Sequence, residues 1–235
     1  MLAADTIAKV ALSPLLIPQG LRIRQRVLVL EEAAGPRAGR LGQGPELRLL
    51  ILGDSSAAGV GVDYQDNALA GHLTRNISRD RTVDWQLWAR CGATTQSTLV
   101  DLDERPADQF DAAVTCLGVN DITRGLSLRR WLAGQRALFE RLETRHGVRR
   151  IFVTGMPPLG RFPLLPQPMR AILGAQAKRY DMALRAMLTG SPGRLHYSLD
   201  LPDDPSLMAR DGFHLGARVY AAWGEQLANR MLPLV

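Results

Sequence analysis

The sequence predicts an α/β fold built on a parallel sheet, and two observations lead to that prediction. Apolar runs of strand length alternate along the 235 residues with amphipathic stretches of helix length, an order that is typical of βαβ units. The hydrophobic fraction of 46% and the charged fraction of 22% are those of a globular protein with a buried core. The length suits one such domain, or at most two small ones.

Residues 1–46 are expected to form an N-terminal apolar arm and a linker ahead of a main domain at 47–235. Pro14 and Pro18 interrupt the apolar run, which makes it a poor signal peptide. The run is also shorter than the ~18 apolar residues that a membrane span needs. We expect a helical arm packed on the domain of a cytoplasmic protein, with weak contact between the arm and a membrane surface as the alternative. The linker, 35–46, has the Gly and Pro content of a connecting loop.

Five strands are expected in the main domain. The first, "LRLLILG" at 47–53, is apolar without interruption, as is typical of a strand buried on both faces of a sheet. The other four cover residues 82–89, 110–121, 149–158 and 194–200. Helices are expected at residues 63–78, 95–104, 127–145 (capped by Ser127), 168–189 and 217–232. Because each helix joins two strands or follows the last one, the strands are expected to be parallel.

Chemically capable residues follow four of these strands, at the point where each strand ends. Asp54 and Ser55 follow the first strand, Gly92 follows the second, and "GVND" at 118–121 ends the third. The loop "ARDGFHLG" at 209–216 comes after the fifth. In open α/β sheets, ligands bind beyond the carboxyl ends of the strands. The sequence therefore predicts a functional site at that edge of the sheet.

The turn after the first strand, "GDSSAAGVGVD", is compatible with phosphate binding, with a nucleophile or with a simple change of direction. A P-loop needs a nearby lysine, and the only two lysines, Lys9 and Lys178, are distant in the sequence. The glycines also lack the Gly-x-Gly-x-x-Gly spacing of a dinucleotide site. Asp54 would place a negative charge beside a phosphate. We therefore favour Ser55 as a nucleophile, with Asp54 as a structural brace of the turn.

A serine nucleophile needs a base, and His214 is the best candidate among the four histidines. It lies in a Gly-flanked loop three residues after Asp211. At that spacing the carboxylate can accept the Nδ1 proton of the imidazole, which leaves Nε2 free to take the proton of a serine. His72, His146 and His196 fall within or at the ends of helix and strand patterns, so we expect structural roles for them.

An acyl-transfer site also needs hydrogen-bond donors for the negative charge that develops on the carbonyl oxygen. Gly92 has no side chain and can bring its N–H close to a substrate. Asn120 offers a carboxamide N–H, and the N–H of Ser55 itself is a third donor. Asp121, next to Asn120, is expected to hold its own loop in place.

Together these residues resemble the four sequence blocks of the SGNH (GDSL-type) hydrolases. The blocks are "GDSS" at 53–56, "ARCGATT" around Gly92, "GVND" at 118–121 and "DGFH" at 211–214, and they occur in the family's order. The resemblance covers about residues 48–232 and leaves the N-terminal 45 residues outside. Ser56 stands where many members have leucine.

The resemblance implies a flavodoxin-like three-layer sandwich with a five-stranded parallel sheet. It also implies a serine esterase mechanism that uses no metal and no cofactor. Carried over residue by residue, Ser55 is the nucleophile, His214 is the general base and Asp211 orients it. Gly92, Asn120 and the N–H of Ser55 form the oxyanion hole.

The net charge of +6 and the pI of about 10 come from scattered arginines with no run longer than two. Because aromatic residues are not interleaved with them, no nucleic-acid partner is expected. Cys91 and Cys116 lack metal-ligand spacing and are expected to be buried free thiols, with a single disulfide as the alternative. Cys91 is expected beside the pocket, whereas Trp85 and Trp88 are expected in the core.

The substrate is expected to be a small-molecule acyl ester, and the loop "GMPPLGRFPLLPQPM" at 155–169 bears on its class. This apolar loop either walls an acyl pocket or forms a rigid cover over the core. A pocket favours small acyl esters, lysophospholipids or thioesters over acetylated polysaccharide. The alternatives are an acyltransferase or a carbohydrate O-deacetylase on the same site, and a catalytically silent binding module.

Overall fold

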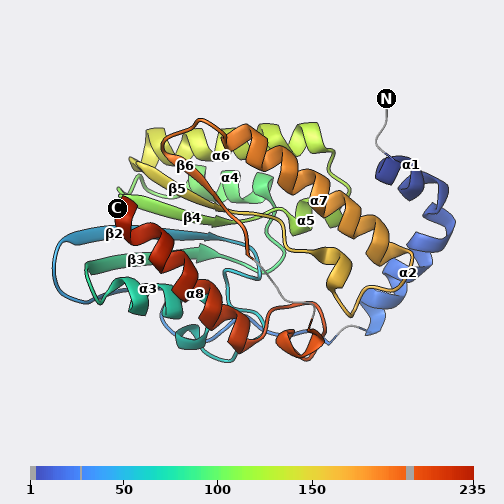
Figure 1. The fold of residues 1–235 in the computed structure, drawn as a ribbon, viewed down its shortest axis with the longest axis horizontal. Helices are drawn as coiled ribbons and strands as arrows, with labels where there is room; N and C mark the ends of the chain where they lie inside the picture. Colours follow the sequence, from blue (N-terminus) through green and yellow to red (C-terminus); the bar gives the residue numbers. More distant parts are fainter. Residues whose placement is uncertain (1–3, 27, 200–203) are drawn as a thin grey trace.

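A six-stranded sheet with helices on both faces forms the centre of the computed structural model, which describes residues 4–26, 28–199 and 204–235 (Figure 1). The strands are β1 (Ala38–Leu41), β2 (Glu46–Gly53), β3 (Thr82–Ala89), β4 (Ala112–Cys116), β5 (Arg150–Thr154) and β6 (Arg194–Tyr197). They lie in the order β1-β3-β2-β4-β5-β6, and β2 to β6 are parallel. The parallel strands therefore have the order of flavodoxin-like folds. The predicted α/β architecture is confirmed, with six strands instead of five.

The sixth strand, β1, comes from the segment expected to be only a linker. It pairs antiparallel with β3, from Ala38 opposite Gln86 to Leu41 opposite Val83. Three of its four residues are exposed, so this edge strand is held by backbone hydrogen bonds and not by apolar burial. For that reason the sequence lacks the apolar alternation that would have predicted it. The domain boundary at residue 46 stays a prediction.

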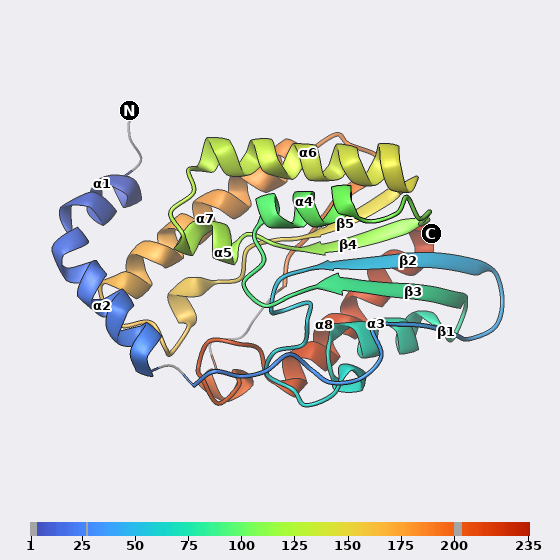
Figure 2. The same cartoon turned by 180° about the vertical axis from the view of Figure 1, so that it is seen from behind.

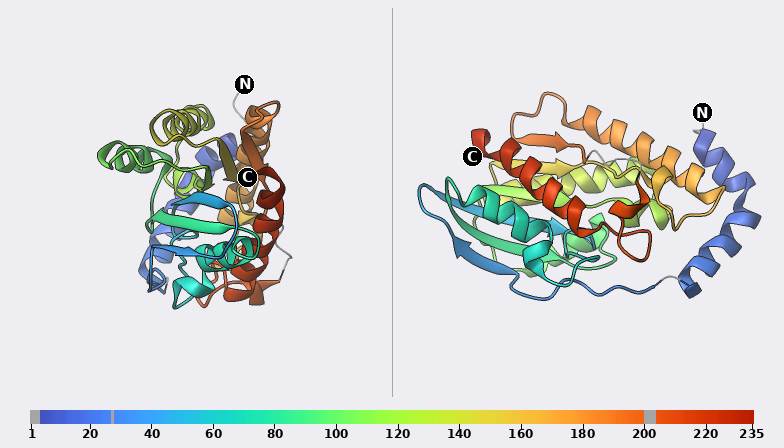
Figure 3. Two further views of the ribbon diagram at one scale, coloured as in Figure 1. Left: turned by 90° about the vertical axis from the view of Figure 1, so that its left-hand side faces the viewer. Right: turned by 60° about the horizontal axis from the view of Figure 1, so that its bottom comes forward.

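Two helical layers enclose the sheet. The α-helices are α1 (Ala4–Ala11), α2 (Ser13–Arg26), α3 (Leu69–Ile77), α4 (Thr95–Glu104), α5 (Val119–Thr123), α6 (Leu128–His146), α7 (Met169–Leu188) and α8 (Ala217–Met231). Short 3₁₀ helices are η1 (Gln65–Asn67), η2 (Leu159–Arg161), η3 (Pro205–Leu207) and η4 (Leu232–Leu234). Helices α3 and α8 cover one face of the sheet, and α4, α6 and α7 cover the other (Figure 3). Their apolar side chains fill the two cores.

Strand β2 shows why the sheet is buried on both faces. Leu49 and Ile51 point into the core under α3 and α8, whereas Leu50 and Leu52 point into the core under α4, α6 and α7. All four side chains are fully buried. The uninterrupted apolar run thus follows from the need to fill two cores from one strand.

The N-terminal arm, α1 and α2, packs along α7 and the loop that precedes it (Figures 1 and 3). Arg179 on α7 donates to Asp5 at 2.8 Å, and the Gln19 side chain donates to the Gln167 carbonyl at 2.7 Å. Among the described residues, none of the helices is both long and apolar enough to cross a bilayer.

Candidate active site

The turn that presents Ser55 begins at Gly53, the last residue of β2, which pairs with Cys116 of β4. A Cβ atom on Gly53 would lie 2.5 Å from the Cys116 carbonyl oxygen, so only glycine fits at the end of the strand. The next N–H, that of Asp54, donates to the same carbonyl at 3.0 Å. The Val60 N–H then donates to the Ser55 carbonyl at 3.0 Å and closes the turn. These contacts fix the half-buried Ser55 at the carboxyl edge of the sheet.

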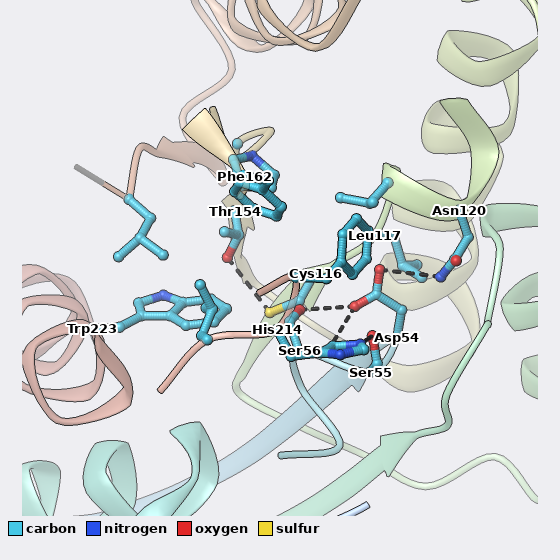
Figure 4. A pocket seen from close by; sticks show the side chains of 16 residues that line it. Asp54, Ser55, Ser56, Cys116, Leu117, Asn120, Thr154, Phe162, His214 and Trp223 are labelled. Carbon is cyan, nitrogen blue, oxygen red and sulfur yellow. Dashed lines mark hydrogen bonds between the residues drawn. The ribbon is translucent and has the colours of Figure 1, made fainter. Parts of the chain in front are cut away.

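The structure brings Ser55, His214 and Asp211 together. His214 Nε2 lies 3.0 Å from Ser55 Oγ, and His214 Nδ1 lies 2.5 Å from Asp211 Oδ2 (Figure 4 shows the Ser55–His214 contact). The other oxygen of Asp211 accepts the backbone N–H groups of Phe213 and His214, both at 3.0 Å. The loop after β6 therefore holds the carboxylate and the imidazole in a fixed mutual orientation.

Hydrogen bonding keeps Asp211 ionised although its side chain is buried. Burial tends to raise the pKa of Asp211, but hydrogen bonds from His214 and the Phe213 N–H outweigh it and leave that pKa lowered. A carboxylate that stays negative beside an imidazole stabilises the imidazolium form. The arrangement can therefore accept a proton from Ser55.

Asn120 reaches the same site from the first turn of α5. Its Nδ2 donates to the Ala93 carbonyl at 3.0 Å and lies 3.5 Å from Asp54 Oδ2 (Figure 4). The preceding Gly118 has a φ of +134°, and a Cβ there would lie 2.1 Å from Met156. Glycine is thus required for the chain to turn into α5 and present Asn120 to the pocket.

Gly92 lies in the loop after β3 and does not line the pocket beside Ser55. Its φ is +74°, and among the described residues only the Arg124 guanidinium, at 3.5 Å, lies within 4 Å of a Cβ built there. That guanidinium also donates to the Gly92 carbonyl at 2.9 Å. Of the predicted site residues, Ser55, Asn120 and His214 line the pocket, whereas Asp211 and Gly92 do not.

A largely apolar pocket opens beside Ser55 and His214 (Figure 4). Its apolar lining comes from Leu117, Val119, Pro157, Phe162, Leu199, Phe213, Leu215 and Trp223. The cavity volume is about 70 Å³. Loop 155–169 contributes Pro157 and Phe162 to this wall, and Phe162 also belongs to the core under α7. The loop therefore both walls a pocket and covers the core.

Two aspartates near the site have structural contacts. The Ser56 N–H and hydroxyl donate to Asp54 Oδ1 at 3.0 and 2.8 Å, so Ser56 is the residue that holds the Asp54 carboxyl. Burial raises the pKa of Asp54 in spite of these two donors. Asp121 accepts the N–H and the hydroxyl of Thr95 and so links α5 to the start of α4, not only to its own loop.

The two cysteines are free, as expected, but only one is buried. Cys116 lines the pocket and lies 3.6 Å from the Thr154 hydroxyl. Burial raises its pKa to about 12, so it does not supply a thiolate. The expectation that Cys91 is buried beside the pocket is wrong: its side chain is exposed at the end of β3, where solvent and not the sheet covers it.

The remaining histidines lie outside the site. His146 is buried, with Nδ1 3.0 Å from the Asp108 carbonyl, and His72 contacts Arg75. His196 forms a second Asp–His pair, 2.8 Å from Asp181. The sequence does not predict this pair, because its members lie 15 residues apart on α7 and β6 and no motif joins them.

Comparisons with known proteins show the family of the chain. The model of the GDSL-like lipase/acylhydrolase family matches residues 51–222. The GDSL-like esterase Rv1075c of Mycobacterium tuberculosis is 30% identical over 190 residues, which cover 75% of this chain but 59% of that protein's length.

Solved structures share the fold at low identity. A lipolytic protein of the G-D-S-L family from Veillonella parvula aligns with a TM-score of 0.60 and 12% identity, over 80% of this chain and 99% of the other. The inhibitor-bound aryl esterase of M. smegmatis gives 0.57 and 17%, over 80% of this chain and all of the other. These similarities support the fold alone, whereas the family model covers most of the chain. The chain therefore belongs to the GDSL-like lipase/acylhydrolase family, which confirms the resemblance seen in its sequence.

Proposed function

We propose that this protein hydrolyses carboxylic esters of short acyl groups through an acyl-enzyme intermediate on Ser55. One observation carries the proposal: the hydrogen-bonded series of Asp211, His214 and Ser55 ends at the mouth of an apolar pocket. A serine, an imidazole and a buried carboxylate in that order are the parts of a nucleophilic acyl-transfer site.

In the first half-reaction, Ser55 Oγ attacks the ester carbonyl carbon while His214 Nε2 takes its proton. Asp211 stabilises the resulting imidazolium through the Nδ1 contact. The tetrahedral intermediate then collapses, the bond to the leaving alcohol breaks, and His214 protonates that alcohol. In the second half-reaction, His214 takes a proton from water, the hydroxide attacks the acyl carbon, and Ser55 leaves with the proton.

The oxyanion is proposed to bind between the N–H of Ser55 and the side chain of Asn120, with the Gly92 N–H as the third donor. The Ser55 N–H has no hydrogen-bond partner among the described residues. Asn120 Nδ2 must give up one of its two protein contacts, and the 3.5 Å contact with Asp54 is the weaker. Gly92 directly precedes Ala93, whose carbonyl accepts Asn120 Nδ2, so its N–H lies in the segment that contacts Asn120.

The size and the lining of the pocket favour an ester substrate with a short acyl group. A cavity of about 70 Å³ has space for roughly five water molecules, which corresponds to an acyl chain of a few carbons. Its wall of leucine, phenylalanine and tryptophan favours an apolar acyl group. The same chemistry admits a thioester or a lysophospholipid whose chain extends out of the pocket.

Hydrolysis of p-nitrophenyl esters of increasing chain length tests the proposal. We expect the highest kcat/KM for short chains, and a loss of at least about 10⁴-fold in Ser55→Ala. Ser56→Ala is the matched control and should keep most of the activity, because this hydroxyl contacts Asp54 and not His214. A fluorophosphonate probe should label Ser55. Full activity in Ser55→Ala, or labelling of a different residue, contradicts the proposal.

A further inference from the structure

The N-terminal arm carries half of the exposed large apolar side chains among the described residues. Six of the twelve exposed large apolar side chains in the described chain lie in α1, in α2 or at the residue between them: Ile7, Val10, Leu12, Leu15, Ile17 and Leu21. Ile17 is 63% exposed and Val10 is 70% exposed. Such clusters on a protein surface mark sites of interaction with a partner or a membrane.

Helix α2 is apolar on two sides, and only one of them holds it to the domain. Ile23 packs against the core under α7, and Gly20 lies against Met169. On the other side, exposed Ile17 and Leu21 recur at a spacing of four residues, with the exposed prolines of the helix beside them. We call this side, Pro14, Ile17, Pro18 and Leu21, the arm stripe. Docking of α2 on the domain does not require the arm stripe.

The charges around the arm stripe are positive. Arg22 and Arg26 are exposed at the C-terminal half of α2. The only acidic residue in the described part of the arm is Asp5, whose side chain is 8% exposed and paired with Arg179. An apolar stripe bordered by basic residues alone is the pattern of a helix that lies in the interface of an anionic membrane. Two copies of this face would bring like charges together.

The arm also lies at the active-site end of the molecule. In Figure 2 the arrowheads of β2 and β3 point toward the end where α1 and α2 lie. Gln19 on α2 donates to the Gln167 carbonyl in loop 155–169, and Phe162 of that loop lines the pocket beside Ser55. A surface bound by the arm would therefore lie on the same side of the protein as the pocket.

We propose that the arm stripe, together with Arg22 and Arg26, docks this protein on an anionic membrane surface. The apolar side chains enter the boundary between headgroups and acyl chains, and the two guanidinium groups contact lipid phosphates. The docking goes beyond the proposed function and does not depend on it. It places the pocket where esters carried by a membrane can reach it.

Flotation of the full chain with lipid vesicles tests the docking without any turnover. We expect binding to vesicles that contain phosphatidylglycerol and weaker binding to pure phosphatidylcholine. Ile17→Glu with Leu21→Glu should reduce binding at least roughly tenfold, because two buried apolar side chains are replaced by charges. Arg22→Gln with Arg26→Gln should reduce binding to the anionic vesicles roughly fivefold per arginine and weaken its salt dependence.

Val100→Glu and Tyr64→Glu are matched controls, since both side chains are exposed and lie outside the arm. They should bind vesicles like the unmodified protein. Absence of binding to either vesicle, or equal losses in the control variants, overturns the proposal. The proposal is also overturned if vesicle binding is absent and sedimentation shows a dimer that Ile17→Glu dissociates. Hydrolysis of p-nitrophenyl acetate should be unchanged in all these variants, which separates a failure of docking from a failure of the esterase.

Discussion

The molecule contains two Asp–His pairs whose local geometry is similar but whose surroundings differ. Asp211 and His214 lie 2.5 Å apart in the loop after β6, and Asp181 and His196 lie 2.8 Å apart between α7 and β6. In the first pair the free imidazole nitrogen lies 3.0 Å from Ser55 Oγ. An Asp–His pair by itself therefore orients an imidazole but does not make a catalytic site. A hydroxyl and a pocket within reach make it a site.

The second pair belongs to the packing at the edge of the sheet. Asp181 Oδ1 also accepts the Met156 N–H at 2.9 Å, at the point where β5 passes into loop 155–169. A Cβ on Gly155 would lie 2.3 Å from that oxygen and 2.8 Å from His196 Nε2. Asp181 and His196 therefore close over a glycine and tie α7, β5 and β6 together.

Removal of each imidazole is the strongest way to separate the two pairs. His214→Ala should lower kcat/KM for a p-nitrophenyl ester by about 10⁴-fold or more, because Ser55 loses its base. His196→Ala should change kcat/KM less than about threefold. Steady-state kinetics of both purified variants measures the difference. Equal losses in the two variants would contradict the assignment of His214 as the base.

Neutralising each carboxylate gives the next largest effect. Asp211→Asn should lower kcat by about 10²–10⁴-fold with little change in KM, because the amide no longer stabilises the imidazolium and favours the wrong tautomer. Asp181→Asn should leave kcat within about threefold of the unmodified protein. Parallel kcat and KM measurements test this. A kcat loss in Asp181→Asn as large as that in Asp211→Asn would contradict the assignment of only the first pair to the catalytic site.

Removal of an oxyanion donor beside the first pair should lower kcat by less than removal of the base. Asn120→Ala should lower kcat by about 10²–10³-fold, which is the usual cost of one oxyanion donor. Thr123→Ala in the same helix is the control, because its hydroxyl donates to the Asn120 carbonyl at 3.2 Å and not to the carboxamide. If both variants lost activity equally, the effect would come from the helix and not from the carboxamide.

The first pair and its serine could be predicted from the sequence because their signals are short patterns within single segments. The spacing of Asp211 and His214 fits inside one loop, and the apolar run of β2 predicts a strand that delivers Ser55 to the sheet edge. Edge strand β1 could not be predicted from the sequence, because backbone pairing and not burial holds it in the sheet.

The second pair depends on how α7 and β6 pack, and residue spacing does not encode that contact. The same reason explains Cys91: a strand-end residue faces solvent or sheet according to its neighbours in space. Ser56 stands where many members of the family have leucine, and its contact with Asp54 appears only once the turn is folded.

The smallest expected effect concerns the stability that the second pair supplies. Burial tends to raise the pKa of Asp181, but hydrogen bonds from His196 and the Met156 N–H outweigh it and leave that pKa lowered. A lowered pKa in the folded state means that the ionised carboxylate stabilises the fold above the ordinary value of 3.8. This stabilisation is lost as the pH falls through the folded-state pKa.

Asp181→Asn should therefore lower the free energy of unfolding by about 1–2 kcal/mol at neutral pH, the difference between charge-assisted and neutral hydrogen bonds. The gap between the variant and the unmodified protein should narrow as the pH falls below 3.8. Urea unfolding at several pH values measures this gap. A gap that stays constant with pH would show that the amide disturbs packing, since only the loss of an ionised group makes the difference disappear in acid.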